Sequence, residues 1–341
     1  MATLDYARRL QNIQNRKFDN ELNESVISKS FSSTEIPQNI KYLAESMRKI
    51  DQKYNNRTFD AATRVQKHLQ DNFDLHFNRA YKTQGSVKTD TNIKVHSDFD
   101  LLTVIDRYHF LEPGLPNENS YTDSSPDDDI QELRNQSIKI LKTIYDEVDT
   151  SGAKSISIFN KSLNRKVDIV FCFWYHSKKY LETNDEHYKG IYLYEFPTKT
   201  KKRDYPFAHI NNVNHKGNTT TDGSRKGVRL LKNLKADAET GIKLNSFQLT
   251  SIVHTIENSS LNYTYGNELL IAKAISDELN LMINEPAHRK LVTSPNGTEN
   301  PFEKEESVPE LKKLKIDLDT LIIDSAKEIN SPSIRKALIN Y

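Results

Sequence analysis

The sequence predicts an α+β protein, in which an α/β lobe with a mixed sheet is packed on a C-terminal helical lobe. Apolar residues recur at helical spacing in the first 72 residues, and strand-like segments follow between residues 75 and 194. Helical spacing returns from about residue 221 to 327. We therefore expect two lobes: residues 1–205, with N-terminal helices that bridge both, and residues 206–341.

The N-terminal part is expected to form amphipathic helices. A first stretch with this pattern covers roughly residues 4–28. A second runs from Thr58 to Phe73, where Ala61, Val65 and Leu69 recur at helical spacing.

Several segments in the middle of the chain are predicted to be strands. In residues 98–105, the positions after the acids are mostly apolar on both alternating faces of the predicted strand. This pattern is typical of a central strand that is buried on both faces. Their β-branched and aromatic residues predict further strands at 75–84, 155–159, 166–174 and 190–194.

A helix is predicted to begin at Ser125 and to continue to about Val148. Serine suits the cap, Pro126 suits the first helical position, and Asp127, Asp128 and Asp129 suit the first turn. The acidic triplet would also suit a metal ion, but helix entry is the favoured interpretation.

The C-terminal lobe is expected to be helical throughout. The predicted helices cover roughly residues 221–239, 246–258, 265–283 and 309–327. Residues 293–301 contain Pro and Gly and are predicted to link the last two.

Composition limits the class of protein. Hydrophobic residues make up 36% of the chain, charged residues make up 28%, and no run of about 18 apolar residues occurs, so a soluble, cytoplasmic protein without a membrane span is expected. Cys172 is the single cysteine, which excludes an internal disulfide and a cysteine-based zinc module. The net charge of +1 argues against a broadly basic nucleic-acid binder.

A glycine–serine pair and three aspartates form the candidate chemical site. Asp98 and Asp100 lie two residues apart in a predicted strand, so their side chains project from the same face. Asp168 interrupts a later apolar strand. Three carboxylates suit two Mg²⁺ (or Mn²⁺) ions, which would activate an attacking hydroxyl and steady a triphosphate. Gly85 and Ser86 would start a helix whose free backbone N–H groups meet the phosphates.

The acidic pair alone is weak evidence for a metal site. With 47 acidic residues in 341, chance supplies roughly six acid–x–acid pairs. The alternative interpretation is that these acids lie exposed at strand ends or pair with Arg165 or Lys166. Their place in apolar strands favours a metal site, because a buried carboxylate without a partner is costly.

A basic row on a predicted helix is a candidate for binding the triphosphate. Arg225, Arg229 and Lys232 fall on one face of the helix, apart from its apolar stripe. Such a row is usually a solvated face. The other interpretation is that Lys232 reaches the β- and γ-phosphates.

The next predicted helix begins with a second candidate. Asn245 and Gln248 resemble a capping box, and the hydroxyl of Ser246 would suit a phosphate contact at the helix N-terminus. Phe247 is a core candidate by composition, but an aromatic ring here would also stack on a nucleobase, which contributes about 1–3 kcal/mol.

These motifs together resemble the nucleotidyltransferase signature of polymerase-β-like enzymes: Gly85-Ser86-x-x-Thr89-x-Thr91, Ser97-Asp98-Phe99-Asp100 and Val167-Asp168. Residues 205–238 and 244–249 are similar to the bacterial CD-NTases, which are relatives of cyclic GMP–AMP synthase and oligoadenylate synthase. The narrower resemblance rests on Lys232 followed, after thirteen residues, by Ser246-Phe247. The resemblance covers roughly residues 56–285.

The resemblance implies a role for each candidate residue. The three aspartates would be the catalytic metal ligands and would bind two Mg²⁺ ions. The donor triphosphate would be held by Gly85, Ser86, Lys232 and Ser246, and Phe247 would lie against the donor base. The helical lobe would thus complete the nucleotide pocket.

The family's activity gives the expected function. Its members make cyclic di- or trinucleotides from NTPs, with release of pyrophosphate, and the product activates an effector encoded nearby in anti-phage defence. Some members also have a regulatory partner. The resemblance therefore implies a second-messenger synthase, with base, linkage and ring size left open. Zinc-dependent DNA binding is not expected, because the chain has a single cysteine.

Two other functions fit the same motifs. Nucleotidyl transfer to an RNA, a protein or a small molecule would use the same three acids. A catalytically inactive nucleotide-binding interaction protein is a hypothesis of another class, and the intact glycine–serine pair and acids argue against it.

Overall fold

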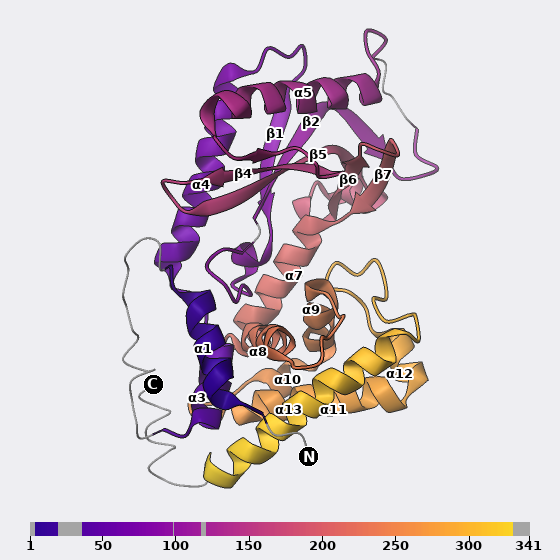
Figure 1. Ribbon diagram of the computed structural model, residues 1–341. Helices are drawn as coiled ribbons and strands as arrows, with labels where there is room; N and C mark the ends of the chain where they lie inside the picture. Colours follow the sequence, from indigo (N-terminus) through magenta and orange to yellow (C-terminus); the bar gives the residue numbers. More distant parts are fainter. Residues whose placement is uncertain (1–3, 20–35, 98, 117–120, 330–341) are drawn as a thin grey trace. The chain divides into compact units, whose positions relative to one another are not determined.

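The computed structural model describes residues 4–19, 36–97, 99–116 and 121–329 (Figure 1). The chain divides into two compact units. The sheet unit comprises residues 51–88 and 96–211, and the helical unit comprises the described parts of residues 1–50, 89–95 and 212–341. Helices and strands together confirm the predicted α+β class.

The sheet unit is built on a mixed sheet, as the sequence predicts, and its described residues form seven strands, of which β3 and β7 were not predicted. The strand order is β1-β2-β5-β4-β3, and β6 pairs with both β5 and β7. The β2–β5 pair is parallel, whereas the other pairs are antiparallel. The strands are β1 (Arg79–Gln84), β2 (Asp100–Leu111), β3 (Val148–Asp149), β4 (Ser155–Asn160), β5 (Arg165–His176), β6 (Lys189–Glu195) and β7 (Thr200–Asp204).

The central strand β2 is buried on both faces, which confirms the prediction. Leu101 and Ile105 belong to the larger apolar cluster of this unit, whereas Leu102 and Val104 join Cys172 in a smaller one. Successive side chains of a strand point to opposite faces, so the two clusters mark the two faces of the sheet. We call these the helix face and the Cys172 face.

Two helices cover the helix face (Figure 1). They are α4 (Gln52–Asn72) and α5 (Pro126–Ile144), whose apolar residues join the larger cluster. The Ser125 side chain caps α5 by accepting a hydrogen bond from the Asp128 backbone N–H, which confirms the predicted helix entry. The helix ends four residues before the predicted Val148, because the chain becomes extended at Tyr145 and β3 begins at Val148.

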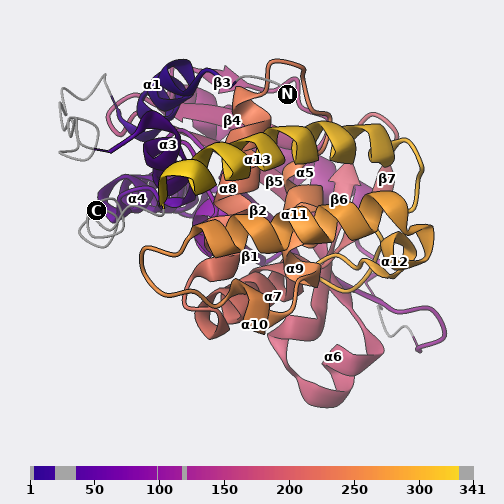
Figure 2. The same ribbon diagram turned by 90° about the horizontal axis from the view of Figure 1, so that it is seen from below.

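The helical unit has its own apolar core, to which α1, α3, α8, α9, α11 and α13 contribute. Figure 2 shows α11 and α13 side by side. The helices of this part of the chain are α1 (Tyr6–Lys17), α3 (Gln38–Met47), α7 (Pro206–Thr219), α8 (Gly223–Asp237), α9 (Ser246–Thr255), α10 (Asn258–Leu261), α11 (Leu269–Asn284), α12 (Pro286–Leu291) and α13 (Ser307–Ile329). The short helices α6 (Lys178–Thr183) and η3 (Glu186–Tyr188) belong to the sheet unit, and η2 (Ser86–Thr89) lies at its boundary.

The N-terminal helices contribute to the helical unit. Leu10 and Ile13 of α1 and Tyr42 of α3 lie in its core, whereas the prediction placed them in residues 1–205 as helices that bridge both lobes. Residues 89–95 also belong to the helical unit. The first helix ends at Lys17, and residues 20–28 of the predicted stretch lie outside the described residues.

The longest helix that was not predicted in the described residues is α7. It is rich in Asn, a weak helix former, and it begins at Pro206 and continues past Asn211, where the two units divide. Residues 293–301 form turns without helix or strand, as expected for a linker. None of the described helices combines the length and the apolar character needed to cross a lipid bilayer.

Candidate active site

Two of the predicted acids lie side by side on the sheet. Asp100 of β2 is directly opposite Asp168 of β5 in the parallel register, and the Asp168 backbone N–H donates to Phe99 O at 3.0 Å. Both acids share strand parity with residues of the Cys172 face, so both carboxylates project from that face. Asp98, the third predicted ligand, lies outside the described residues.

Strand pairing supplies the polar neighbours of these two acids. Gln84 is opposite Asp100 in the β1–β2 register and donates from Nε2 to Asp100 Oδ2 at 2.8 Å. Ser157 is opposite Asp168 in the β4–β5 register, and its hydroxyl donates to the Asp168 carboxylate. The apolar Cys172 face therefore has a polar end around Asp100 and Asp168.

The alternative pairing of the acids with basic residues is partly observed. Lys166 Nζ lies 3.0 Å from Asp168 Oδ1, but about half of the Lys166 side chain is exposed, so this pair adds little stability. The buried Arg165 guanidinium instead donates to Thr58 Oγ1 at 3.2 Å and to Asn164 O at 2.6 Å.

The donor set around these acids fits a hard cation. Two adjacent carboxylates offer the oxygen ligands that Mg²⁺ prefers. The Asp168 side chain is only 14% exposed, so most of its charge must be compensated within the site. Within the described ranges, no three His, Cys, Asp or Glu side chains group as metal ligands, and Asp98 stands outside those ranges.

The glycine–serine pair directly follows the strand that contacts Asp100. Gly85 has φ of 118°, a conformation that favours glycine because it has no Cβ. Ser86 starts η2, and the Lys88 backbone N–H donates to Gly85 O at 3.1 Å. The predicted helix start is thus present as a four-residue 3₁₀ turn.

Two of the three cations in the basic row on α8, Arg229 and Lys232, are buried, and Arg225 is half-buried, so the interpretation as a solvated face is wrong. Arg229 is 1% exposed and donates from Nε to Met47 O at 2.6 Å and from Nη1 to Asp90 O at 2.6 Å. Its Nη2 lies 2.5 Å from Asp222 Oδ2. The row is covered because α3 and residues 89–95 pack on this side of the helix, which helical spacing alone does not reveal.

Lys232 is a buried cation that donates to neutral oxygens. It is 8% exposed, and Nζ donates to Thr91 O at 3.0 Å, with Thr91 Oγ1 at 3.5 Å. No carboxylate of the described residues lies within ion-pair distance of its ammonium group. Burial, followed by repulsion from Arg229 and Lys235, lowers the pKa of Lys232 to about 8. An anion at this position would stabilise the charged form.

The start of α9 contains the predicted capping box. Asn245 Oδ1 accepts from the Gln248 backbone N–H at 2.8 Å, and Gln248 Oε1 accepts from the Asn245 backbone N–H at 2.9 Å. Ser246 is exposed at the first helical position, and Phe247 is half-buried. Their roles in binding a nucleotide remain predictions.

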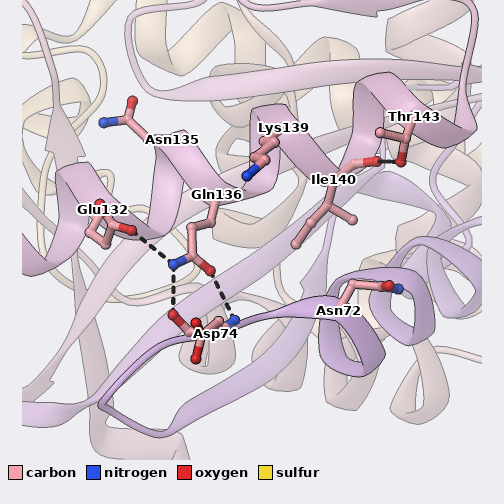
Figure 3. Close-up of a pocket in the computed structure, with 8 residues that line it drawn as sticks. All are labelled: Asn72, Asp74, Glu132, Asn135, Gln136, Lys139, Ile140 and Thr143. Carbon is pink, nitrogen blue, oxygen red and sulfur yellow. Dashed lines mark hydrogen bonds between the residues drawn. The ribbon is translucent and has the colours of Figure 1, made fainter.

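A groove of about 440 Å³ lies elsewhere in the sheet unit, between the end of α4 and α5 (Figure 3). Gln136 joins its two sides, because Nε2 donates to Asp74 O at 2.6 Å and Oε1 accepts from the Asp74 backbone N–H at 3.0 Å. None of the predicted site residues lines this groove. It lies beside the helices that cover the helix face, whereas Asp100 and Asp168 project from the Cys172 face.

Sequence reasoning missed the contacts that shape these sites. Gln84 and Ser157 contact the acids only through strand register, which a motif does not contain. Asp90 and Thr91 accept from Arg229 and Lys232 because residues 89–95 pack on α8. The row of cations was a usable signal, because charged residues in an otherwise apolar helix often have a specific partner.

No family model matches the chain, but known proteins do. The cyclic dinucleotide synthase CdnE of Yersinia aleksiciae is 32% identical over 297 residues, which cover 85% of this chain and 77% of the relative. A c-di-GMP synthase of Capnocytophaga granulosa is 30% identical over 339 residues, which cover 90% of this chain and 95% of the relative. The solved structure of a STING-associated CdnE c-di-GMP synthase from Capnocytophaga granulosa aligns with a TM-score of 0.81 at 28% identity, covering 95% of this chain and 99% of the other.

Proposed function

The chain belongs to the CdnE cyclic dinucleotide synthases of the CD-NTase family, and we propose that it joins two GTP molecules into c-di-GMP with release of pyrophosphate. Family membership makes the chain a nucleotidyltransferase with a polymerase-β-like fold, as the sequence predicts. The choice of GTP is supported by the activity in the name of the Capnocytophaga granulosa relative.

The observation that carries the proposal is the pairing of Asp100 with Asp168 on neighbouring parallel strands. In the proposed site these two acids and Asp98 hold two Mg²⁺ (or Mn²⁺) ions. Ions bound there would supply Lewis-acid stabilisation of the attacking hydroxyl and of the leaving pyrophosphate. Gln84 and Ser157 orient the carboxylates through hydrogen bonds, so that their ligand oxygens are preorganised.

The donor triphosphate is assigned to residues whose chemistry suits phosphate. Lys232 offers a buried ammonium group, and Gly85 and Ser86 offer backbone N–H groups at a turn. Ser246 offers a hydroxyl at the N-terminus of α9, and Phe247 a ring for the donor base. The hydroxyl of the second nucleotide would then attack the α-phosphorus in line, and a second round would close the ring.

The product is proposed to act as a second messenger in anti-phage signalling in the cytoplasm. The related Capnocytophaga granulosa structure is described as STING-associated. We propose that the product of this chain likewise activates an effector that binds cyclic dinucleotides. A regulatory partner of the synthase is part of the same proposal.

The test is incubation of the purified full chain with single and mixed NTPs and Mg²⁺ or Mn²⁺, followed by phosphatase treatment and mass determination. We expect c-di-GMP from GTP alone, resistant to phosphatase because a ring has no terminal phosphate. A cyclic GMP–AMP product would correct the choice of base. A requirement for an added RNA, protein or small-molecule acceptor would favour the transfer reaction. Absence of turnover with every nucleotide would favour an inactive binding protein.

A further inference from the structure

We propose that His109 and His176 form a second metal site, for a transition-metal ion of the Zn²⁺, Ni²⁺ or Cu²⁺ class. This site would lie on the same face of the sheet as Asp100 and Asp168. It belongs to the other end of β2 and β5, because the acids are near the first residues of these strands and the histidines are near the last.

Strand register brings the two rings together. His109 is opposite Trp174, and His176 lies two residues further along β5, so both side chains project from the Cys172 face. A register shift between Ile105 and His109 places His109 on this face, and such irregularities often re-aim a side chain at a functional position. His109 Nδ1 and His176 Nε2 are 3.3 Å apart.

This separation matches the edge of a metal coordination tetrahedron. Zinc binds imidazole nitrogen at about 2.0–2.1 Å, so two nitrogens at the tetrahedral angle are about 3.3–3.4 Å apart. The observed distance therefore allows one ion to bind both nitrogens with little movement of either ring. Imidazole ligands suit Zn²⁺, Cu²⁺ and Ni²⁺, whereas Mg²⁺ prefers oxygen ligands.

Metal binds the neutral form of imidazole, and burial favours that form in both rings. Burial, followed by the influence of His109 and Lys189, lowers the pKa of His176 to about 4. Burial also lowers the pKa of His109, although Asp106 opposes this shift.

The charged neighbours of the pair are Asp106 and Lys189. Asp106 Oδ1 lies 3.9 Å from His109 Nε2 and accepts from Trp174 Nε1 at 2.9 Å. At 3.9 Å this carboxylate is beyond hydrogen-bond distance of the second ring nitrogen, so it acts on His109 through its charge, which favours a bound cation. Lys189 is the opposing charge, but its Nζ lies over the Trp174 ring, 3.8 Å from the centroid, and burial lowers its pKa.

The test is calorimetric titration of the full chain with Ni²⁺ in excess Mg²⁺, which keeps the carboxylate site occupied by a hard cation. We expect one Ni²⁺ ion per chain, with affinity at least tenfold weaker in His109→Gln and in His176→Gln. Asp106→Asn should weaken affinity less than either histidine variant, because only a nearby charge is lost.

The matched control is His215→Gln, at an exposed position of α7, which should bind Ni²⁺ as the wild type does. The proposal is overturned if the wild type binds no Ni²⁺, if His176→Gln binds it equally well, or if His215→Gln loses it. A measurement on the wild type covers the case in which a variant fails to fold. The electron paramagnetic resonance spectrum with one equivalent of Cu²⁺ should show coupling to two imidazole nitrogens, and oxygen ligands alone would contradict the proposal.

Discussion

The aspartates of the sheet unit and the cations of α8 differ in where their partners come from. Asp100 and Asp168 are surrounded by side chains of the same sheet, which strand register places opposite or beside them. Arg229 and Lys232 instead donate to backbone carbonyls of distant segments, at Met47, Asp90 and Thr91. The acids thus accept hydrogen bonds from side chains, whereas the cations donate hydrogen bonds to main-chain carbonyl groups.

The difference shows what each group still requires. Two carboxylates side by side repel each other, and Lys166, which pairs with Asp168, is half exposed. Lys232 is buried beside a second cation, and it donates to neutral oxygens of Thr91. In the proposed site a metal ion would satisfy the first group and a phosphate the second.

The largest expected effect comes from removing the charge of the acids. Asp98→Asn with Asp100→Asn should lower product formation by at least roughly 1,000-fold, since metal-based charge stabilisation is worth several kcal/mol. The fold should persist, because the amide introduced by Asp100→Asn keeps an oxygen that accepts from Gln84. Product formation and circular dichroism measure the two outcomes.

Asp146→Asn is the control for this double variant, because Asp146 is an exposed acid paired with Lys161. It should turn over normally. Wild-type turnover in the double variant would end the assignment of these acids to the metal site.

How far the sequence could predict these groups follows from the same comparison. The β2–β5 core was predictable because apolar residues at both parities indicate a strand buried on both faces, and Leu101 and Leu102 bear this out. The burial of Arg229 could not be predicted, because residues 89–95 and Met47 contact it only in the folded chain. Helix α7 was missed because packing overrides the weak helix propensity of its Asn residues.

The next largest effect concerns the cation. Lys232→Met should raise the KM for NTP by roughly 30-fold, because a charge-assisted hydrogen bond contributes about 2 kcal/mol. The melting temperature should change little, since the desolvation cost of the ammonium disappears together with its hydrogen bond to Thr91. Initial rates against NTP concentration and thermal melting measure both.

Lys235→Met, one turn further along α8, is the matched control and should leave the KM unchanged. If Lys232→Met lowers the melting temperature and leaves nucleotide affinity intact, Lys232 serves only to hold residues 89–95.

A smaller effect is expected from pH. The free protein holds the pKa of Lys232 at about 8, below the ordinary value of 10.5. Phosphate binding should raise this pKa, so NTP binding takes up a proton, and affinity falls as pH rises through 8. If only the charged form binds, affinity drops by about tenfold between pH 7 and 9. Binding titrations across this range should show the drop in the wild type and lose it in Lys232→Met; the same slope in both would place the titrating group elsewhere.

The smallest effect separates two neighbours at the start of α9. Asn245 accepts from the Gln248 backbone N–H, so Asn245→Ala should cost about 1 kcal/mol and lower the melting temperature by about 2–4 °C. It should leave the KM for NTP nearly unchanged. Ser246 is exposed, so Ser246→Ala should leave melting unchanged and raise the KM by about fivefold, the worth of a hydrogen bond of about 1 kcal/mol. If Asn245→Ala raises the KM and Ser246→Ala does not, the start of α9 affects nucleotide binding through its fold. The Ser246 hydroxyl group would then have no role in binding.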